Sequence, residues 1–222
     1  MKLIAPLSKS QYGIYVECAT HIGEPYYNLP YIYELDPSLD RQRLLTAIEM
    51  AFKAHPTLFT RITLTDDGEP MQTLDMAGEQ WSLEVEEIQD IQQEKSRLVT
   101  PFEIDGGRLF HINLMHTSDH YYLFLDYHHI IVDGTSMQIM LQDIDKAYRG
   151  EDIQPEEISL MQVAQDEAGR RETQEFEEAK QWYAQQFDCG DTFTQFMPDL
   201  EGETHTEDHL ARTLGLDLSE VE

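Results

Sequence analysis

The sequence has few basic residues, only two cysteines and no long apolar run. Of its 222 residues, 15 are Lys or Arg and 43 are Asp or Glu, so the formal net charge is −28. A surface this acidic repels nucleic-acid phosphates and anionic membranes, and we exclude both as partners. We interpret the charge mainly as a source of solubility.

The two cysteines, Cys18 and Cys189, are far apart and form no CxxC pattern, which fits a reducing cytoplasm. No apolar stretch is long enough to span a bilayer, and the run at residues 1–6 is too short for a signal peptide. We therefore expect a cytoplasmic protein. Hydrophobic residues make up 41% of the chain, which is typical of a globular protein.

The hydrophobic pattern changes period several times along the first 150 residues. Apolar stripes at helical spacing predict helices over residues 8–20, 40–54, 88–98 and 135–148. Alternating or continuous apolar runs predict strands over residues 27–35, 58–64, 81–85, 109–115 and 121–127. Strands and helices alternate without a regular βα repeat, so we predict an α+β fold, a mixed sheet with helices packed on it.

The last third of the chain is more polar. We predict a linker over residues 151–157 and one or two surface helices over residues 158–187. The composition of residues 188–207 predicts a loop. An alternating pattern resumes at residues 210–218, just before the chain ends. We therefore divide the chain into a lobe at 1–187 and, at 188–222, a linker with the start of a truncated second lobe.

The most informative stretch is His128-His129-Ile130-Ile131-Val132-Asp133-Gly134, between an apolar strand and an amphipathic helix. A base on a tight strand-to-helix turn can expose one reactive nitrogen to a substrate. Gly134 can take backbone angles that other residues avoid and lets a substrate come close. The amides around Thr135 and Ser136 offer donors for developing negative charge.

The chain has no GxSxG nucleophile elbow and no cysteine near the motif. Direct transfer to an acceptor, with a histidine as base, is therefore more natural than a covalent acyl-enzyme. The alternative is a buried histidine pair satisfied by backbone groups. The spacing of the whole motif favours catalysis.

The turn matches the HHxxxDG signature of condensation domains of nonribosomal peptide synthetases, in the chloramphenicol-acetyltransferase-like superfamily. Upstream, Pro6-Leu7-Ser8-Lys9-Ser10-Gln11 with Tyr15 is similar to the family's opening LSxxQ motif, and residues 54–61 resemble its second motif. Residues 180–183 are similar to its bridging segment. The resemblance implies the N-terminal lobe of a two-lobed fold, whose active site is a tunnel between the lobes. The second lobe is missing here.

The resemblance also implies roles for the motif residues. His129 would be the catalytic histidine and His128 its mostly structural neighbour, while Gly134 would face the reacting groups. Asp133 would hold the loop through a salt bridge to an arginine, because a buried carboxylate without a partner is costly. The family often has arginine where Phe59 stands in this sequence, so Arg61 is our candidate partner.

The activity implied is amide (peptide) bond formation between an acyl or peptidyl thioester on one carrier protein and an amine on another. The chain would bind no cofactor directly, and both substrates would arrive on phosphopantetheine of donor and acceptor carrier-protein domains. Epimerisation domains share the signature, so the reaction stays open between the two. The DxxxxD form of heterocyclisation domains is absent.

A hypothesis of another class is a non-catalytic lobe that works by binding or dimerising. The protein sequence after Glu222 separates the two hypotheses, because a second lobe would restore the tunnel. Without that lobe, the chain leaves apolar surface uncovered, so we expect it to be inactive and to self-associate.

The remaining candidates favour structural roles. His205 and His209 have helical i, i+4 spacing but lie in a polar loop without a metal motif, so we predict no metal site there. His111, His116 and His120 lie on or beside one predicted hairpin and are expected to be structural. The run at residues 66–68 is too short for a calcium loop and predicts a plain turn.

Overall fold

The computed structural model describes residues 3–76 and 82–187. The chain divides into two compact units, Met1–Glu178 and Ala179–Glu222. The first unit holds two sheets with helices packed on them, which confirms the α+β class. Within the described residues, no helix has the length and apolar character needed to cross a membrane.

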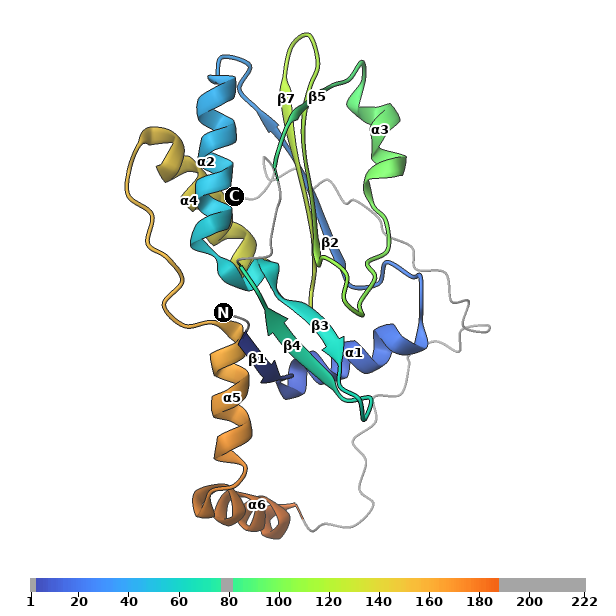
Figure 1. Cartoon of the computed structure of the whole chain (residues 1–222), viewed down its shortest axis with the longest axis vertical. Helices are drawn as coiled ribbons and strands as arrows, with labels where there is room; N and C mark the ends of the chain where they lie inside the picture. The colour runs from blue at the N-terminus through green and yellow to red at the C-terminus, as the bar shows by residue number, and fades with distance from the viewer. Residues whose placement is uncertain (1–2, 77–81, 188–222) are drawn as a thin grey trace, which may run out of the picture. The chain divides into compact units, whose positions relative to one another are not determined.

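The larger sheet has four strands in the order β2-β7-β6-β5 (Figure 1). They are β2 (Asn28–Leu35), β5 (Val85–Glu87), β6 (Phe110–His116) and β7 (Tyr121–His128). β7 pairs antiparallel with both β2 and β6, whereas β5 runs parallel to β6. β7 is therefore a central strand, and it leads directly into the motif.

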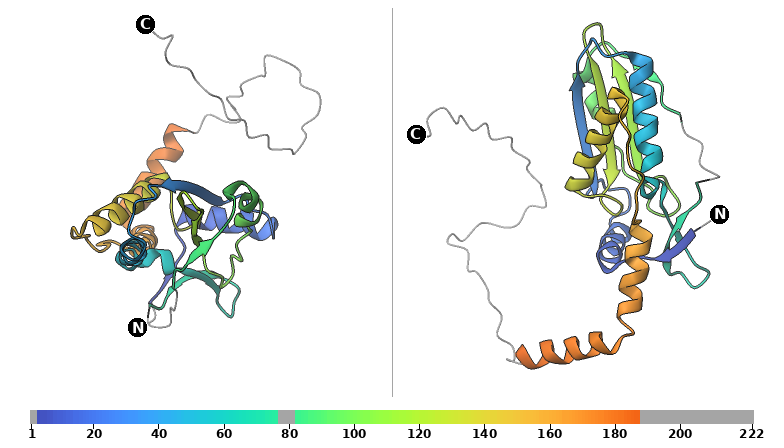
Figure 2. Two further views of the ribbon diagram at one scale, coloured as in Figure 1. Left: turned by 90° about the horizontal axis from the view of Figure 1, so that it is seen from above. Right: turned by 90° about the vertical axis from the view of Figure 1, so that its left-hand side faces the viewer.

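Helices cover both faces of this sheet (Figures 1 and 2). α2 (Arg41–Ala54) and α4 (Gly134–Arg149) pack together on one face, and α3 (Ile91–Leu98) lies on the other. Side chains alternate along β7, so Leu123 and Leu125 join the larger core and Phe124 joins the cluster beneath α3. This two-sided cover explains why nearly every residue of β7 is apolar or aromatic.

Local signals set the ends of these helices. The side chain of Asp40 accepts a hydrogen bond of 2.7 Å from the amide of Arg43 and caps α2. α4 ends at Gly150, whose φ of 79° lies in the left-handed region that glycine tolerates. The predicted helices over 40–54 and 135–148 are therefore confirmed.

The smaller sheet has the order β1-β4-β3, all antiparallel, from β1 (Leu3–Pro6), β3 (Arg61–Leu64) and β4 (Pro70–Leu74). The turn before β4 contains Gly68 with φ of 83°. Beside this sheet lies α1 (Lys9–Thr20), which begins with a capping box between Ser8 and Gln11. α5 (Leu160–Arg170) packs against β1.

The structure corrects two strand predictions. The first two residues of the predicted strand at 58–64 belong to a 3-10 helix, η1 (Pro56–Phe59), because Pro56 fixes φ and the consecutive residues Leu58 and Phe59 are both buried. The predicted strand at 81–85 is also wrong, since β5 starts only at Val85 and Trp81 lies outside the described residues. The partner of β3 is instead β4, which the hydrophobic pattern does not indicate.

The region 158–187 contains two helices, α5 and α6 (Gln174–Gln186). Within the second unit, the rings of Trp182 and Tyr183 meet edge to face with centroids 5.0 Å apart, and Tyr183 stacks on Phe187 at 6.0 Å. The predicted loop at 188–207 and strand at 210–218, with His205 and His209, lie outside the described residues.

Candidate active site

Backbone hydrogen bonds fix the turn that follows β7. The amide of His128 donates to the carbonyl oxygen of Leu109 at 2.9 Å, and the amide of His129 donates to that of Tyr27 at 2.8 Å. The amide of Ile131 then closes the turn on the His128 carbonyl at 3.1 Å. The first two bonds therefore anchor the turn to segments that are distant in the sequence.

His128 is buried, with 4% of its surface exposed. Its Nδ1 accepts a hydrogen bond of 3.1 Å from the amide of Ile130, so the proton of the neutral ring sits on Nε2. Burial, and then the neighbouring His129, lowers the pKa of His128 to about 4, against an opposing effect of Asp126. His128 is thus a neutral side chain, in keeping with a structural role.

His129 is exposed, although it lies between two buried residues. The imidazole ring of His129 makes no hydrogen bond to any of the described residues. The backbone is held while the imidazole is presented to the outside. This is the arrangement that a general base needs in order to reach a substrate from outside the lobe.

Asp133 caps α4. Its Oδ1 accepts hydrogen bonds from the amide of Ser136 at 2.9 Å and from the hydroxyl of Ser136 at 2.8 Å, and its own amide donates to that hydroxyl at 3.2 Å. These bonds, the amide first, lower the pKa of Asp133, with a smaller contribution from His129. Asp133 is exposed, so the premise of a buried carboxylate is wrong.

The capping bond also changes the expected role of the helix N-terminus. The Ser136 amide already donates to Asp133, and the Thr135 amide also interacts with that carboxylate. The expectation that these amides stabilise charge on a substrate is therefore wrong in this arrangement, because their acceptor is part of the chain.

Arg61 lies on β3, where its Nη1 donates a hydrogen bond of 3.0 Å to the carbonyl oxygen of Gly106. That contact ties β3 to the loop before β6. The ion pair between Arg61 and Asp133 stays a prediction.

Gly134 is the first residue of α4 and is exposed. Its φ is not positive, so the expectation of unusual backbone angles is wrong. A Cβ atom built there would meet no described atom within 4 Å. The space in front of Gly134 is open, as a residue that faces the reacting groups requires.

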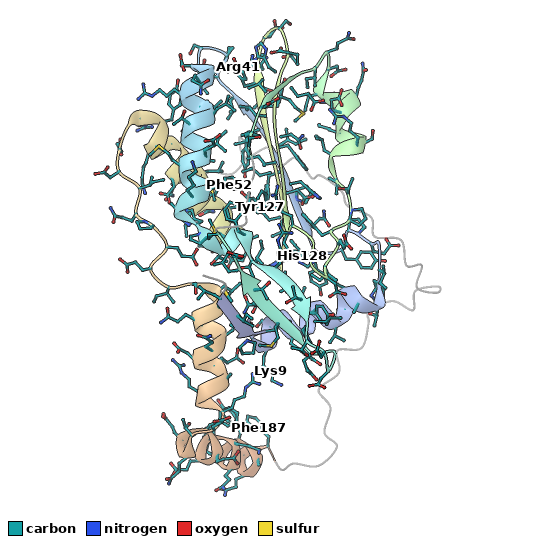
Figure 3. All side chains as sticks on the ribbon, viewed as in Figure 1. Lys9, Arg41, Phe52, Tyr127, His128 and Phe187 are labelled. Atoms are coloured by element: carbon teal, nitrogen blue, oxygen red, sulfur yellow. The ribbon has the colours of Figure 1, made fainter. Side chains whose placement is uncertain are left out.

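A pocket of about 380 Å³ lies beside the turn. Its walls are mostly apolar and come from η1, the turn, α4 and the segment 156–163, with Leu58, Ile131, Met137, Ile139, Met140 and Val163 among the lining residues. Tyr127 also lines it, and among the described residues its buried hydroxyl has no hydrogen-bond partner. Figure 3 shows Tyr127 beside Phe52 of α2, and their rings stack at 6.3 Å.

Sequence reasoning missed a polar pair between half-buried His55, which lines this pocket, and buried Asp143. The Nε2 atom of His55 lies 2.9 Å from Oδ2 of Asp143, and Nζ of Lys146 lies 2.9 Å from Oδ1. Asp143 is 6% exposed. The signal was present in the sequence, because an acidic residue at a core position of an amphipathic helix needs a partner.

The hairpin histidines lie in ion-pair and ring contacts. His111 stacks on Phe102 with centroids 4.3 Å apart, and its Nδ1 is 3.5 Å from Oδ2 of the buried Asp126. His116 pairs with Glu87 at 2.8 Å, and His120 pairs with Glu34 at 3.4 Å. In residues 3–76 and 82–187, no cluster of three or more His, Cys, Asp and Glu side chains could hold a metal ion.

The sequence profile of the condensation domain family matches residues 1–221. The chain belongs to the condensation domain family. It is 30% identical over 164 residues to surfactin synthase subunit 1 of Bacillus subtilis (strain 168), a match that covers 72% of this chain. It is also 31% identical over 150 residues to gramicidin S synthase 2 of Aneurinibacillus migulanus, covering 67% of this chain. The resemblance stated from the motifs is confirmed.

Solved condensation domains share the fold. The starter condensation domain of rhizomide synthetase superposes with a TM-score of 0.71 at 17% identity, over 83% of this chain and 48% of that chain. The first condensation domain of the calcium-dependent antibiotic synthetase, bound to a substrate analogue, gives a TM-score of 0.65 at 19% identity, over 85% and 50%.

The chain matches only part of these proteins. It spans 4% of surfactin synthase subunit 1, 3% of gramicidin S synthase 2 and about half of each solved condensation domain. A match to half of a two-lobed domain agrees with the expectation of a single lobe.

Proposed function

We propose that this chain supplies the N-terminal lobe of a nonribosomal peptide synthetase condensation domain, with His129 as its base or amine-positioning residue. The observation that carries the proposal is the contrast within the motif. His128 is buried, neutral and hydrogen-bonded, whereas the adjacent His129 ring is exposed on a fixed backbone.

The proposed reaction joins an amine to an acyl or peptidyl thioester. The amine nitrogen attacks the thioester carbonyl carbon and forms a C–N bond, the C–S bond breaks, and the nitrogen loses one proton. A neutral His129 imidazole takes that proton, and the departing thiolate of the carrier receives a proton in turn. The products are an amide and a free thiol, so the reaction needs no oxidant or reductant.

The partners in this proposal are donor and acceptor carrier-protein domains, which present their substrates on phosphopantetheine, and a second lobe. The apolar pocket supports the proposal, because Ile131 and Val132 of the turn that carries His129 line it and it could take an apolar substrate group. We place the protein in the cytoplasm, where the free Cys18 would stay reduced.

The test is His129→Ala in a two-lobe protein, in which this chain is followed by the second half of a condensation domain. Amide formation should fall by roughly 100-fold or more, the usual scale for a general base. The matched control is His120→Ala, a partly exposed histidine on the β6–β7 hairpin, which should leave the rate unchanged. Unchanged turnover in a folded His129→Ala protein would remove His129 from the mechanism.

The same assay separates the other hypotheses. Chiral analysis of the carrier-bound substrate detects epimerisation, which inverts a stereocentre without forming an amide. If the two-lobe protein binds carrier proteins but gives neither product, the chain is a binding module instead.

A further inference from the structure

One helix contacts the residues on both sides of His129. From α1, the side-chain amide Nε2 of Gln11 donates to the carbonyl oxygen of Ile130 at 3.1 Å, and Sγ of Cys18 lies 3.4 Å from Nε2 of His128. Gln11 is 3% exposed, so its bond is shielded from water. α1 therefore holds the two neighbours of the exposed histidine from one rigid element.

The direction of the contact with Cys18 follows from the rest of the His128 ring. Nδ1 accepts from the Ile130 amide, which can only donate, so Nδ1 carries no proton. In a neutral imidazole the proton then sits on Nε2. Nε2–H is the donor, and the sulfur of Cys18 is the acceptor.

We propose that Cys18 is a positioning residue for His129, acting through His128. By accepting the Nε2–H bond, Cys18 stabilises the one tautomer of His128 whose Nδ1 can accept from Ile130. That bond closes the turn around His129 and sets the direction of its ring. The effect of Cys18 on catalysis rests on the proposed function, whereas its effect on the tautomer of His128 does not.

The surroundings of Cys18 suit this role. Burial, and then the neighbouring Glu17, raises the pKa of the Cys18 thiol, so the group is an uncharged thiol at neutral pH. The titratable groups that face the Cys18–His128 pair are Glu17, Asp126, His129 and Tyr27. A neutral sulfur accepts a hydrogen bond weakly without pulling a proton onto His128.

The first test measures the tautomer of His128 directly in the 222-residue chain. Long-range ¹H–¹⁵N spectra of ¹⁵N-histidine-labelled protein should show His128 as the Nε2–H form, still unprotonated at about pH 5 because its pKa is about 4. Cys18→Ser keeps an acceptor and should preserve this signature. Cys18→Ala should shift the ¹⁵N signals toward averaged values.

Val16→Ala is the matched control, because Val16 lies on the exposed side of the same helix. It should leave the His128 signals unchanged. His128 signals in folded Cys18→Ala that match the wild type would overturn the inference, as would the Nδ1–H form in the wild type. If Cys18→Ala does not fold, the Cys18→Ser spectrum decides, and loss of the Nε2–H signature there counts against the proposal.

The second test measures kinetics in the two-lobe protein. Cys18→Ala should lower kcat by roughly 10-fold with KM unchanged, the factor that corresponds to about 1.4 kcal/mol. Cys18→Ser should restore most of the rate, which a purely space-filling role would not explain. Equal kcat in the Ala variant and the wild type would overturn the catalytic half. An inactive wild type would contradict the proposed function instead, and the tautomer measurement would still decide this inference.

Discussion

The imidazole of His55 and the carboxylate of Asp143 lie 2.9 Å apart, Nε2 to Oδ2, and join the end of α2 to the middle of α4. Both side chains are largely buried, at 18% and 8% exposure. Because α4 begins at the motif, this pair ties the helix that follows the turn to the rest of the lobe.

Replacing His55 with Ala should destabilise the protein. The change removes a hydrogen bond to the buried Asp143 carboxylate, which keeps Lys146 as a partner, and losing a bond to a charged group costs about 2 kcal/mol. Urea denaturation at pH 7 measures the loss. The control is His120→Ala, whose more exposed pair with Glu34 should change stability by less than about 1 kcal/mol. Equal losses in both variants would contradict the prediction.

Acid should destabilise the protein through His128. Its pKa is about 4 in the folded state against the ordinary 6.5, so the unfolded chain binds more protons between these values. The free energy of unfolding therefore falls as the pH drops from about 6.5 to 4, by about 3 kcal/mol in total from this group. Urea midpoints of the wild type and of His128→Gln are compared across this pH range. The difference between them separates the contribution of His128 from that of the carboxylates. Parallel pH profiles would refute it.

Asp133→Ala should cost about 1 kcal/mol of stability, because it removes the cap of α4. Asp133→Asn keeps a capping oxygen and should stay close to the wild type. A double-mutant cycle with Arg61→Gln then measures any coupling between the two side chains. Zero coupling would remove Arg61 as the partner of Asp133.

Gly134→Ala should leave stability unchanged or raise it slightly, since φ is ordinary and the new methyl group meets no described atom. Condensation by the two-lobe protein should nevertheless fall, because the methyl group would occupy the space through which substrate approaches. Thermal melting and initial rates test the two halves separately. A variant with lower stability and an unchanged rate would contradict both.

The 222-residue chain alone should be inactive and should self-associate more strongly as salt is added. Added salt screens the repulsion from a net charge of −28 and leaves apolar contacts in place. Light scattering over a salt series, with a thioester condensation assay on the same samples, tests both statements. A monomer at high protein concentration and high salt would rule out the association, and rapid condensation would rule out the inactivity.

Local sequence patterns predicted the parts of the fold that are locally determined. Ser8 and Asp40 cap helices, Gly150 ends one, and the apolar stripe of α2 faces the core. β4 was missed because its buried Gln72 looks polar. Gln72 is satisfied by Gln11 and by the carbonyl oxygen of Pro6, which are distant in the sequence.

The candidate site also combines features that are local in the sequence with contacts between distant residues. The motif could be found from a contiguous signature, and the structure shows that its His128 is buried while His129 is exposed. The roles that the resemblance implies for these two histidines stay predictions. The contacts of Cys18 with His128 and of His55 with Asp143 could not be predicted, since they join residues 110 and 88 positions apart. Periodicity places Asp143 at a core position and so shows that it needs a partner, but it carries no information about which distant residue supplies that partner.

The contacts between α1 and the turn also have a consequence for folding kinetics. Gln11 and Ile130 are 119 positions apart, so the bond between them forms only after a long stretch of chain has been ordered. In a folding intermediate that has formed the large sheet but not docked α1, the turn would lack its contacts with α1. The motif residues would then not yet have their native arrangement. Ligand binding at the motif should therefore appear later in refolding than the formation of the sheet, in step with the docking of the N-terminal helix.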